Sequence, residues 1–138
     1  MDSTQASGFE ELPHTADWAL RAWALDLEGL FAESARGMIA LSGAQPAAGP
    51  RLERTFRSRA HDPESLLVRF LTELVYAADE ERLAFDRFKV HLNGDLLEVQ
   101  MSGAPLQSLT KVIKAVTYHN LQIRATQRGF EVEIVFDV

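Results

Sequence analysis

The chain carries an early run in which an imidazole and a carboxylate lie three residues apart, at His14 and Asp17. The run reads HTAD and directly precedes a stretch that suits a strand, so the loop backbone can direct both side chains toward one point. Such a pair can bind a metal ion, or use the imidazole as the base for a metal-bound water. The same residues also suit a plain turn, in which His14 and Thr15 form local hydrogen bonds and Asp17 is hydrated. Spacing alone leaves both interpretations open.

A second group of negative oxygen atoms lies at the other end of the sequence. Asp137 is the penultimate residue and adjoins Val138 with its terminal carboxylate. Ca²⁺ binds about six to eight oxygen ligands, and water supplies those that the protein lacks. These groups therefore suit Ca²⁺, with Mg²⁺ or Mn²⁺ as other candidates, and a frayed, hydrated terminus is the alternative.

One charged residue, Lys114, interrupts the apolar run 112–116 (VIKAV). Its ammonium group must either reach water, which is the usual outcome, or meet an acid or a phosphate. Tyr118 and His119 follow on what we expect to be the same strand. Such side chains more often pack with a hydrogen-bonded tip than take part in catalysis.

The composition excludes several classes of site. The 138 residues include no cysteine, which excludes disulfides and thiolate-bound metals, so any metal must bind oxygen or imidazole. The net charge of -6 argues against a large nucleic-acid footprint, because such binding needs several Lys or Arg contacts to phosphate. The sequence also has no glycine-rich phosphate loop, no paired-histidine zinc helix and no nucleophile elbow.

Neither a membrane segment nor an export signal is indicated. No apolar run approaches the roughly 20 residues that span a bilayer, and residues 1–8 lack the basic start and apolar centre of a signal peptide. We therefore expect a cytoplasmic protein without membrane contact. Residues 1–8 are expected to form a flexible N-terminal tail and residues 9–138 one domain.

Two long helices are expected to support these residues. Apolar residues at three-and-four spacing predict a helix over 27–41 behind Asp26 as its cap. Asp62 followed by Pro63 predicts the start of the main core helix. Its broad apolar face ends near Asp79.

The rest of the chain predicts strands and turns. Strands are expected over 18–23, 51–60 and 130–138, with a hairpin of 88–92 and 97–101 closed by a primed turn at Asn93-Gly94. Loops are expected over 42–50 and 102–110, and a further strand-like run within 112–125. The predicted fold is a single α+β domain, with two long helices packed on a mostly antiparallel β-sheet.

Three segments in this order resemble the archease family: 14–17 (HTAD), 114–119 (KAVTYH) and 136–138 (FDV). Two segments between them agree with the same family, namely 21–31 with RAW followed by DLEGLF, and 64–76 (ESLLVRFLTELVY). The resemblance spans about residues 9–138.

The resemblance implies an accessory protein of an RtcB-type RNA ligase, not an enzyme. In that family the ligase carries the catalytic histidine and manganese, and archease promotes ligase guanylylation and multiple turnover in tRNA splicing and RNA repair. By the same resemblance, the side chains of Asp17 and Asp137 and a main-chain oxygen of Val138 would bind Ca²⁺. Lys114 would act at the active site of the ligase, and RNA would be met only through the ligase.

The sequence departs from the family pattern at three places. Pro13 takes the position of a commonly acidic residue, Ala104 that of a usual Glu, and 108–110 replaces a segment that usually bears Arg or His. The departures put metal affinity and partner contacts in question.

Two other functions remain open. One is a metal-dependent hydrolase that uses Asp17 and Asp137, with His14 as the base. The other is a general chaperone-like modulator of RNA-modifying enzymes, which would need exposed apolar surface and would not depend on Lys114.

Overall fold

The computed structural model describes residues 6–13 and 18–138. The HTAD segment 14–17, and with it the predicted site residues His14 and Asp17, lies outside the described residues.

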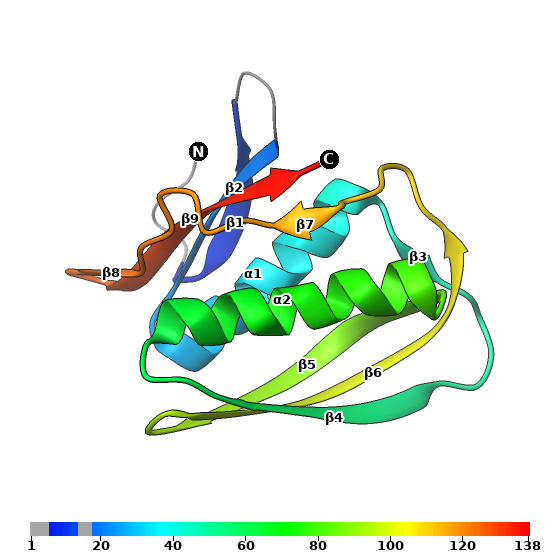
Figure 1. Ribbon diagram of the computed structural model, residues 1–138, viewed down its shortest axis with the longest axis horizontal. Helices are drawn as coiled ribbons and strands as arrows, with labels where there is room; N and C mark the ends of the chain where they lie inside the picture. Colours follow the sequence, from blue (N-terminus) through cyan, green and yellow to red (C-terminus); the bar gives the residue numbers. More distant parts are fainter. Residues whose placement is uncertain (1–5, 14–17) are drawn as a thin grey trace.

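Two helices lie between two antiparallel sheets (Figure 1). The helices are α1 (Leu27–Ser42) and α2 (Pro63–Glu80). The first sheet contains β1 (Gly8–Leu12), β2 (Trp18–Ala24), β9 (Gly129–Asp137), β7 (Ala115–Val116) and β8 (Arg124–Thr126). The second contains β3 (Gln45–Pro46), β6 (Leu96–Ser108), β4 (Leu52–Arg59) and β5 (Leu83–Asn93). The predicted α+β class, with two long helices on antiparallel sheet, is confirmed.

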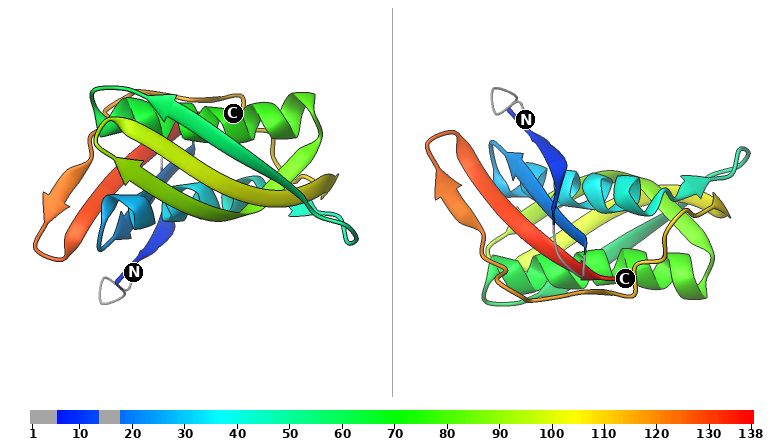
Figure 2. Two further views of the ribbon diagram at one scale, coloured as in Figure 1. Left: turned by 90° about the horizontal axis from the view of Figure 1, so that it is seen from below. Right: turned by 90° about the horizontal axis from the view of Figure 1, so that it is seen from above.

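Each helix contacts both sheets. Helix α1 packs against β1 and β2 of the first sheet and β5 of the second, whereas α2 packs against β4, β5 and β7. Figure 2 shows the second sheet covering the helices from below and the first sheet crossing them from above. The apolar helix faces therefore meet strands on both sides. They form one hydrophobic cluster around the fully buried rings of Phe31, Phe70 and Phe136.

Both helices begin at the predicted caps. The carboxylate of Asp26 accepts a hydrogen bond of 2.7 Å from the Gly29 N–H. The carboxylate of Asp62 accepts one of 2.8 Å from the Ser65 N–H, and this bond, with a second from the Ser65 hydroxyl, lowers the pKa of Asp62. These bonds satisfy donors that the first helical turn leaves without a partner.

The predicted hairpin is present and its turn is of the primed kind. Strand β5 ends at Asn93 and β6 begins at Leu96, so Gly94 and Asp95 form a loop of two residues. Gly94 has φ 63° at the first loop position, which is the conformation that a type II′ turn requires.

The prediction that 102–110 is a loop is wrong, because β6 continues to Ser108. Ala104 pairs with Ala84 of β5, and Leu106 pairs with Pro46 of β3, within the segment 42–50 that was expected to be loop throughout. Glycine at 103 permits this, since a Cβ there would lie 2.1 Å from the carbonyl oxygen of Ala84. A residue type that often interrupts strands here allows a close approach of β5 and β6.

The prediction of one strand carrying Tyr118 and His119 is also wrong. Only Ala115–Val116 and Arg124–Thr126 pair with β9 within 112–125. Between them the Thr117 hydroxyl accepts a hydrogen bond of 3.2 Å from the His119 N–H, and Asn120 has φ 52°. The Thr117 side chain thus satisfies a backbone donor locally, and the left-handed backbone at Asn120 turns the chain.

Within the described residues, neither helix has the apolar length that a membrane crossing needs.

Candidate functional site

The candidate site lies where β9 ends. Strand β7 runs antiparallel to this end of β9, so that Ala115 pairs with Asp137 and Val116 with Phe136. The Lys114 N–H donates a hydrogen bond of 2.7 Å to the main-chain oxygen of Asp137. Lys114 and Asp137, which are 23 positions apart in the chain, are therefore joined by their main chains.

The start of β2 reaches the same end of the sheet from the other side of β9. Trp18, the first described residue after the HTAD segment, pairs with Phe136, the residue before Asp137. The ammonium group of Lys111 lies 5.0 Å from the centre of the Trp18 ring, a cation–π contact that binds the 109–114 segment to β2. No sequence pattern predicts this contact, because an isolated lysine is usually hydrated.

The charged groups of the site are open to water. The side chains of Lys114 and Asp137 are exposed, whereas Val138 is half-buried against the hydrophobic cluster. Within residues 6–13 and 18–138, neither the Lys114 ammonium nor the Asp137 carboxylate has a hydrogen-bond or ion-pair partner. Both groups are thus available to a ligand.

The donor atoms at this end of β9 fit a hard cation. They are the carboxylate of Asp137 and main-chain oxygens, which suit Ca²⁺ better than a soft metal. The Asp137 carbonyl already accepts the Lys114 N–H but retains a second lone pair. No group of three or more His, Asp or Glu side chains in the described part of the chain could hold a metal ion. A cation bound here would take its remaining ligands from water or from outside the described residues.

His119 lies in a different hollow. With Asn120, Arg124 and Glu133, it lines a cavity of about 350 Å³ that Ala19 and Val135 of the first sheet also border. The ring of His119 contacts the Asn120 amide at 3.3 Å, and Arg124 lies 3.6 Å from Glu133. Asp137 does not line this cavity.

Two departures from the family pattern have structural consequences. Ala104 is 1% exposed and lies within the pairing of β5 and β6, so a carboxylate there would lose its water. In the segment 108–110, the Thr110 N–H donates to the main-chain oxygen of Ser42 at 2.9 Å. That segment therefore joins the end of α1. Pro13 is exposed at the end of β1.

Comparison with known proteins gives a consistent family. Residues 9–138 match the model of the archease protein family. Protein archease of Methanosarcina barkeri is 32% identical, over 99% of this chain and 99% of the relative. Protein archease of Saccharolobus islandicus is 29% identical, over 94% of this chain and 98% of the relative.

Two solved structures share the fold. The solution structure of Methanobacterium thermoautotrophicum protein 1598 has a TM-score of 0.69 at 25% identity, covering 95% of this chain and 99% of that one. The crystal structure of an archease, described as a possible chaperone, from Thermotoga maritima has a TM-score of 0.69 at 22% identity, covering 94% and 96%. This second likeness concerns the fold alone. From the family match across residues 9–138 and these full-length relatives, the chain belongs to the archease family.

Proposed function

We propose that this protein is a metal-binding activator of an RtcB-type RNA ligase. It promotes guanylylation and multiple turnover of the ligase in tRNA splicing and RNA repair, works in the cytoplasm and is not itself an enzyme. The protein contacts RNA only through the ligase. The observation that carries the proposal is the joining of Lys114 to Asp137 by β7 and β9, with both side chains exposed and without partners in the described structure.

The arrangement suits electrostatic assistance in another protein's nucleotide site. A bound Ca²⁺ would supply positive charge that attracts phosphate oxygens. Asp137 and a main-chain oxygen of Val138 would hold that ion, together with Asp17, whose chain neighbour Trp18 pairs with Phe136. Lys114 would place its ammonium against the phosphates of the guanylyl donor. Fixing these charges before the reaction reduces the cost of ordering them during it.

The test is guanylylation of the cognate ligase with GTP, with and without this protein. We expect the wild type to accelerate the reaction, and Lys114→Ala, Asp137→Ala and Asp17→Ala each to reduce that acceleration at least about tenfold. Lys89→Ala is the matched control, because Lys89 is an exposed lysine on β5 of the other sheet. Circular dichroism verifies that each variant is folded.

The outcomes separate this function from the two others. A folded wild type that does not accelerate its ligase contradicts the proposal. Metal-dependent hydrolysis by this protein without any ligase would favour the hydrolase. Full acceleration by Lys114→Ala would favour a chaperone-like modulator, which has no need of that ammonium group.

A further inference from the structure

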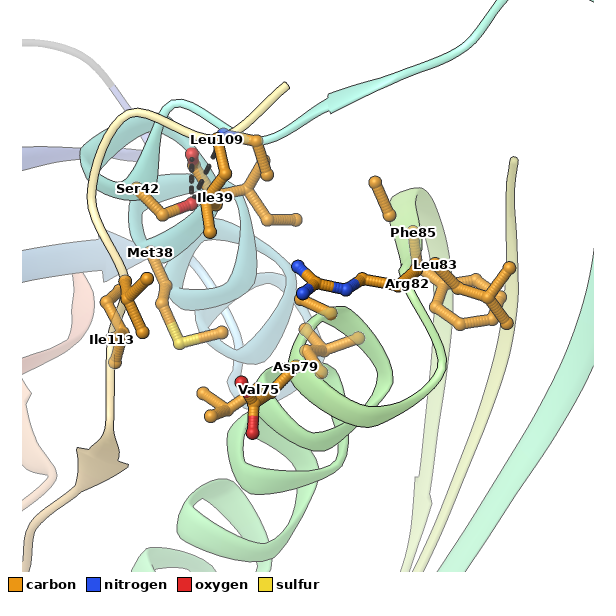
Figure 3. Close-up of a pocket in the computed structure, with 15 residues that line it drawn as sticks. Met38, Ile39, Ser42, Val75, Asp79, Arg82, Leu83, Phe85, Leu109 and Ile113 are labelled. Atoms are coloured by element: carbon orange, nitrogen blue, oxygen red, sulfur yellow. Dashed lines mark hydrogen bonds between the residues drawn. The ribbon is translucent and has the colours of Figure 1, made fainter. Parts of the chain in front are cut away.

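An apolar pocket opens beside the candidate site, between the C-terminal ends of the two helices (Figure 3). Its lining comes from α1, α2, the start of β5 and the segment 109–113. Most of it is aliphatic or aromatic: Met38, Ile39, Ala44, Leu74, Val75, Ala78, Leu83, Ala84, Phe85, Leu109, Val112 and Ile113. The polar lining residues are Ser42, Asp79 and Arg82. Val112 is 51% exposed although it is apolar, so the rim of the pocket presents a hydrophobic side chain to water.

Arg82 is the positively charged residue that lines this pocket. The guanidinium group of Arg82 extends from the turn after α2 into the space beside Ile39 (Figure 3). Among the described residues it has no hydrogen-bond or ion-pair partner. Its backbone is fixed at φ 56°, an uncommon conformation for a residue with a side chain, and its carbonyl accepts the Leu106 N–H at 2.8 Å. These features fix the backbone of Arg82, and its exposed guanidinium can bind a carboxylate.

The size of the pocket limits what can fill it. Its volume is about 60 Å³. A cavity of about 150 Å³ holds benzene, and small-molecule sites usually measure about 300–1,000 Å³. The pocket is therefore too small for a cofactor or a free aromatic ligand, but it suits one aliphatic side chain of another protein.

One segment of the chain connects the pocket to the candidate site. The N–H groups of Thr110 and Lys111 both donate to the main-chain oxygen of Ser42 at 2.9 Å, which fixes the 109–113 segment to the end of α1. The next residue after that segment, Lys114, is bound to Asp137 by its own N–H. Ile113 lines the pocket and adjoins Lys114 directly. The pocket and Lys114 are therefore one residue apart along the chain.

We propose that this pocket receives one aliphatic side chain of the ligase, from a segment in which a neighbouring acidic residue pairs with Arg82. The inference rests on the proposed function and adds an anchoring contact to it. The apolar side chain supplies affinity by leaving water, and the carboxylate fixes its orientation. Lys114 and Asp137 are then presented to the nucleotide site in one position.

The test compares the affinity of the full chain for its cognate ligase, by calorimetry, in wild type and pocket variants. Val112→Asp places a charge on the rim, Ala78→Leu fills the pocket, and Arg82→Glu reverses the charge at the opening. We expect each to raise Kd about tenfold or more. Stimulation of guanylylation at saturating concentration should remain that of the wild type, unlike Lys114→Ala. Leu25→Asp is the control, because Leu25 is 64% exposed and does not line the pocket.

The outcomes distinguish this inference from the function on which it rests. A wild type that stimulates the ligase while folded Val112→Asp and Arg82→Glu bind with unchanged Kd contradicts the inference alone. A wild type that neither binds nor stimulates the ligase contradicts both. A wild-type dimer that Val112→Asp converts to a monomer, measured by sedimentation velocity, would assign the pocket to a second copy of this chain and also contradict the inference.

Discussion

The carboxylate of Asp137 is an exposed charge that no other described residue neutralises. A cation at the end of β9 would be held by this charge, so its removal should be measurable without any ligase. We expect Asp137→Asn to weaken Ca²⁺ binding at least about tenfold in a calorimetric titration. The loss of a direct ligand should cost at least as much affinity as the loss of a residue that only hydrogen-bonds to a ligand. Asp79→Asn is the matched control, since Asp79 is also exposed and unpaired within the described structure.

The same titration tests the role of Val138. A peptide tag added after Val138 should weaken Ca²⁺ binding if a main-chain oxygen of that residue is a ligand. The added residues would pass close to the bound ion and crowd that oxygen. Equal affinities of tagged and untagged protein would remove Val138 from the ligand set.

The residue types predict which side chains form the candidate site, but they do not predict how those side chains are arranged. The chemistry of Lys114 and Asp137 and the family resemblance predict both as site residues. Their adjacency depends on the pairing of β7 with β9, and β7 contains only two residues. A strand of two residues is too short to show the alternation of apolar and polar residues by which strands are recognised in a sequence. Arg82 could not be selected at all, because its position depends on a left-handed backbone and on packing between two helix ends.

The elements differ in how strongly their sequences determine them. Both helices have long apolar stripes and acidic caps, and their predicted starts agree with the structure. The predicted strand ends at Met101, whereas β6 continues through Gly103 and Pro105, two residue types that usually interrupt strands. Only the position of β5 explains why a glycine is required there. Strand β1 was not predicted, although it pairs with β2, the next strand along the chain.

Gly103 offers a test of this close approach. Its φ lies outside the left-handed region, so alanine is permitted by the backbone, but the new Cβ would lie 2.1 Å from the Ala84 carbonyl. We expect Gly103→Ala to lower the free energy of unfolding by about 1–3 kcal/mol, the usual cost of overpacking, in a urea titration. Gly8→Ala should cost less, because its new Cβ meets the Trp23 ring at 2.8 Å and a side chain can shift. Equal losses would contradict this explanation.

At the scale of the whole molecule, the two sheets share one hydrophobic cluster. Leu71 of α2 is fully buried in this cluster, as are Ile134 of the first sheet and Val99 of the second. Neither sheet therefore has a core of its own. We expect the protein to unfold in one cooperative step.

The two tryptophans make this measurable, because Trp18 and Trp23 both lie in β2 of the first sheet. Tryptophan fluorescence and far-ultraviolet circular dichroism should give coincident urea transitions. Leu71→Ala should shift both together, with a loss of about 2–5 kcal/mol. Separate midpoints for the two signals would show that the first sheet unfolds independently.

The place of β9 in the first sheet has a consequence for how the chain is made. It is the last strand of the described chain, yet it lies between β2 and the short strands β7 and β8. During synthesis β1, β2 and α1 leave the ribosome long before β9, whereas β3, β4, β5 and β6 of the second sheet are contiguous in the chain apart from α2. The second sheet can pair while translation continues, but the edge of β2 that does not pair with β1 must wait for β9. Before β9 has left the ribosome, Lys114 therefore cannot form its main-chain hydrogen bond with Asp137. A chain released before β9 is made lacks this site.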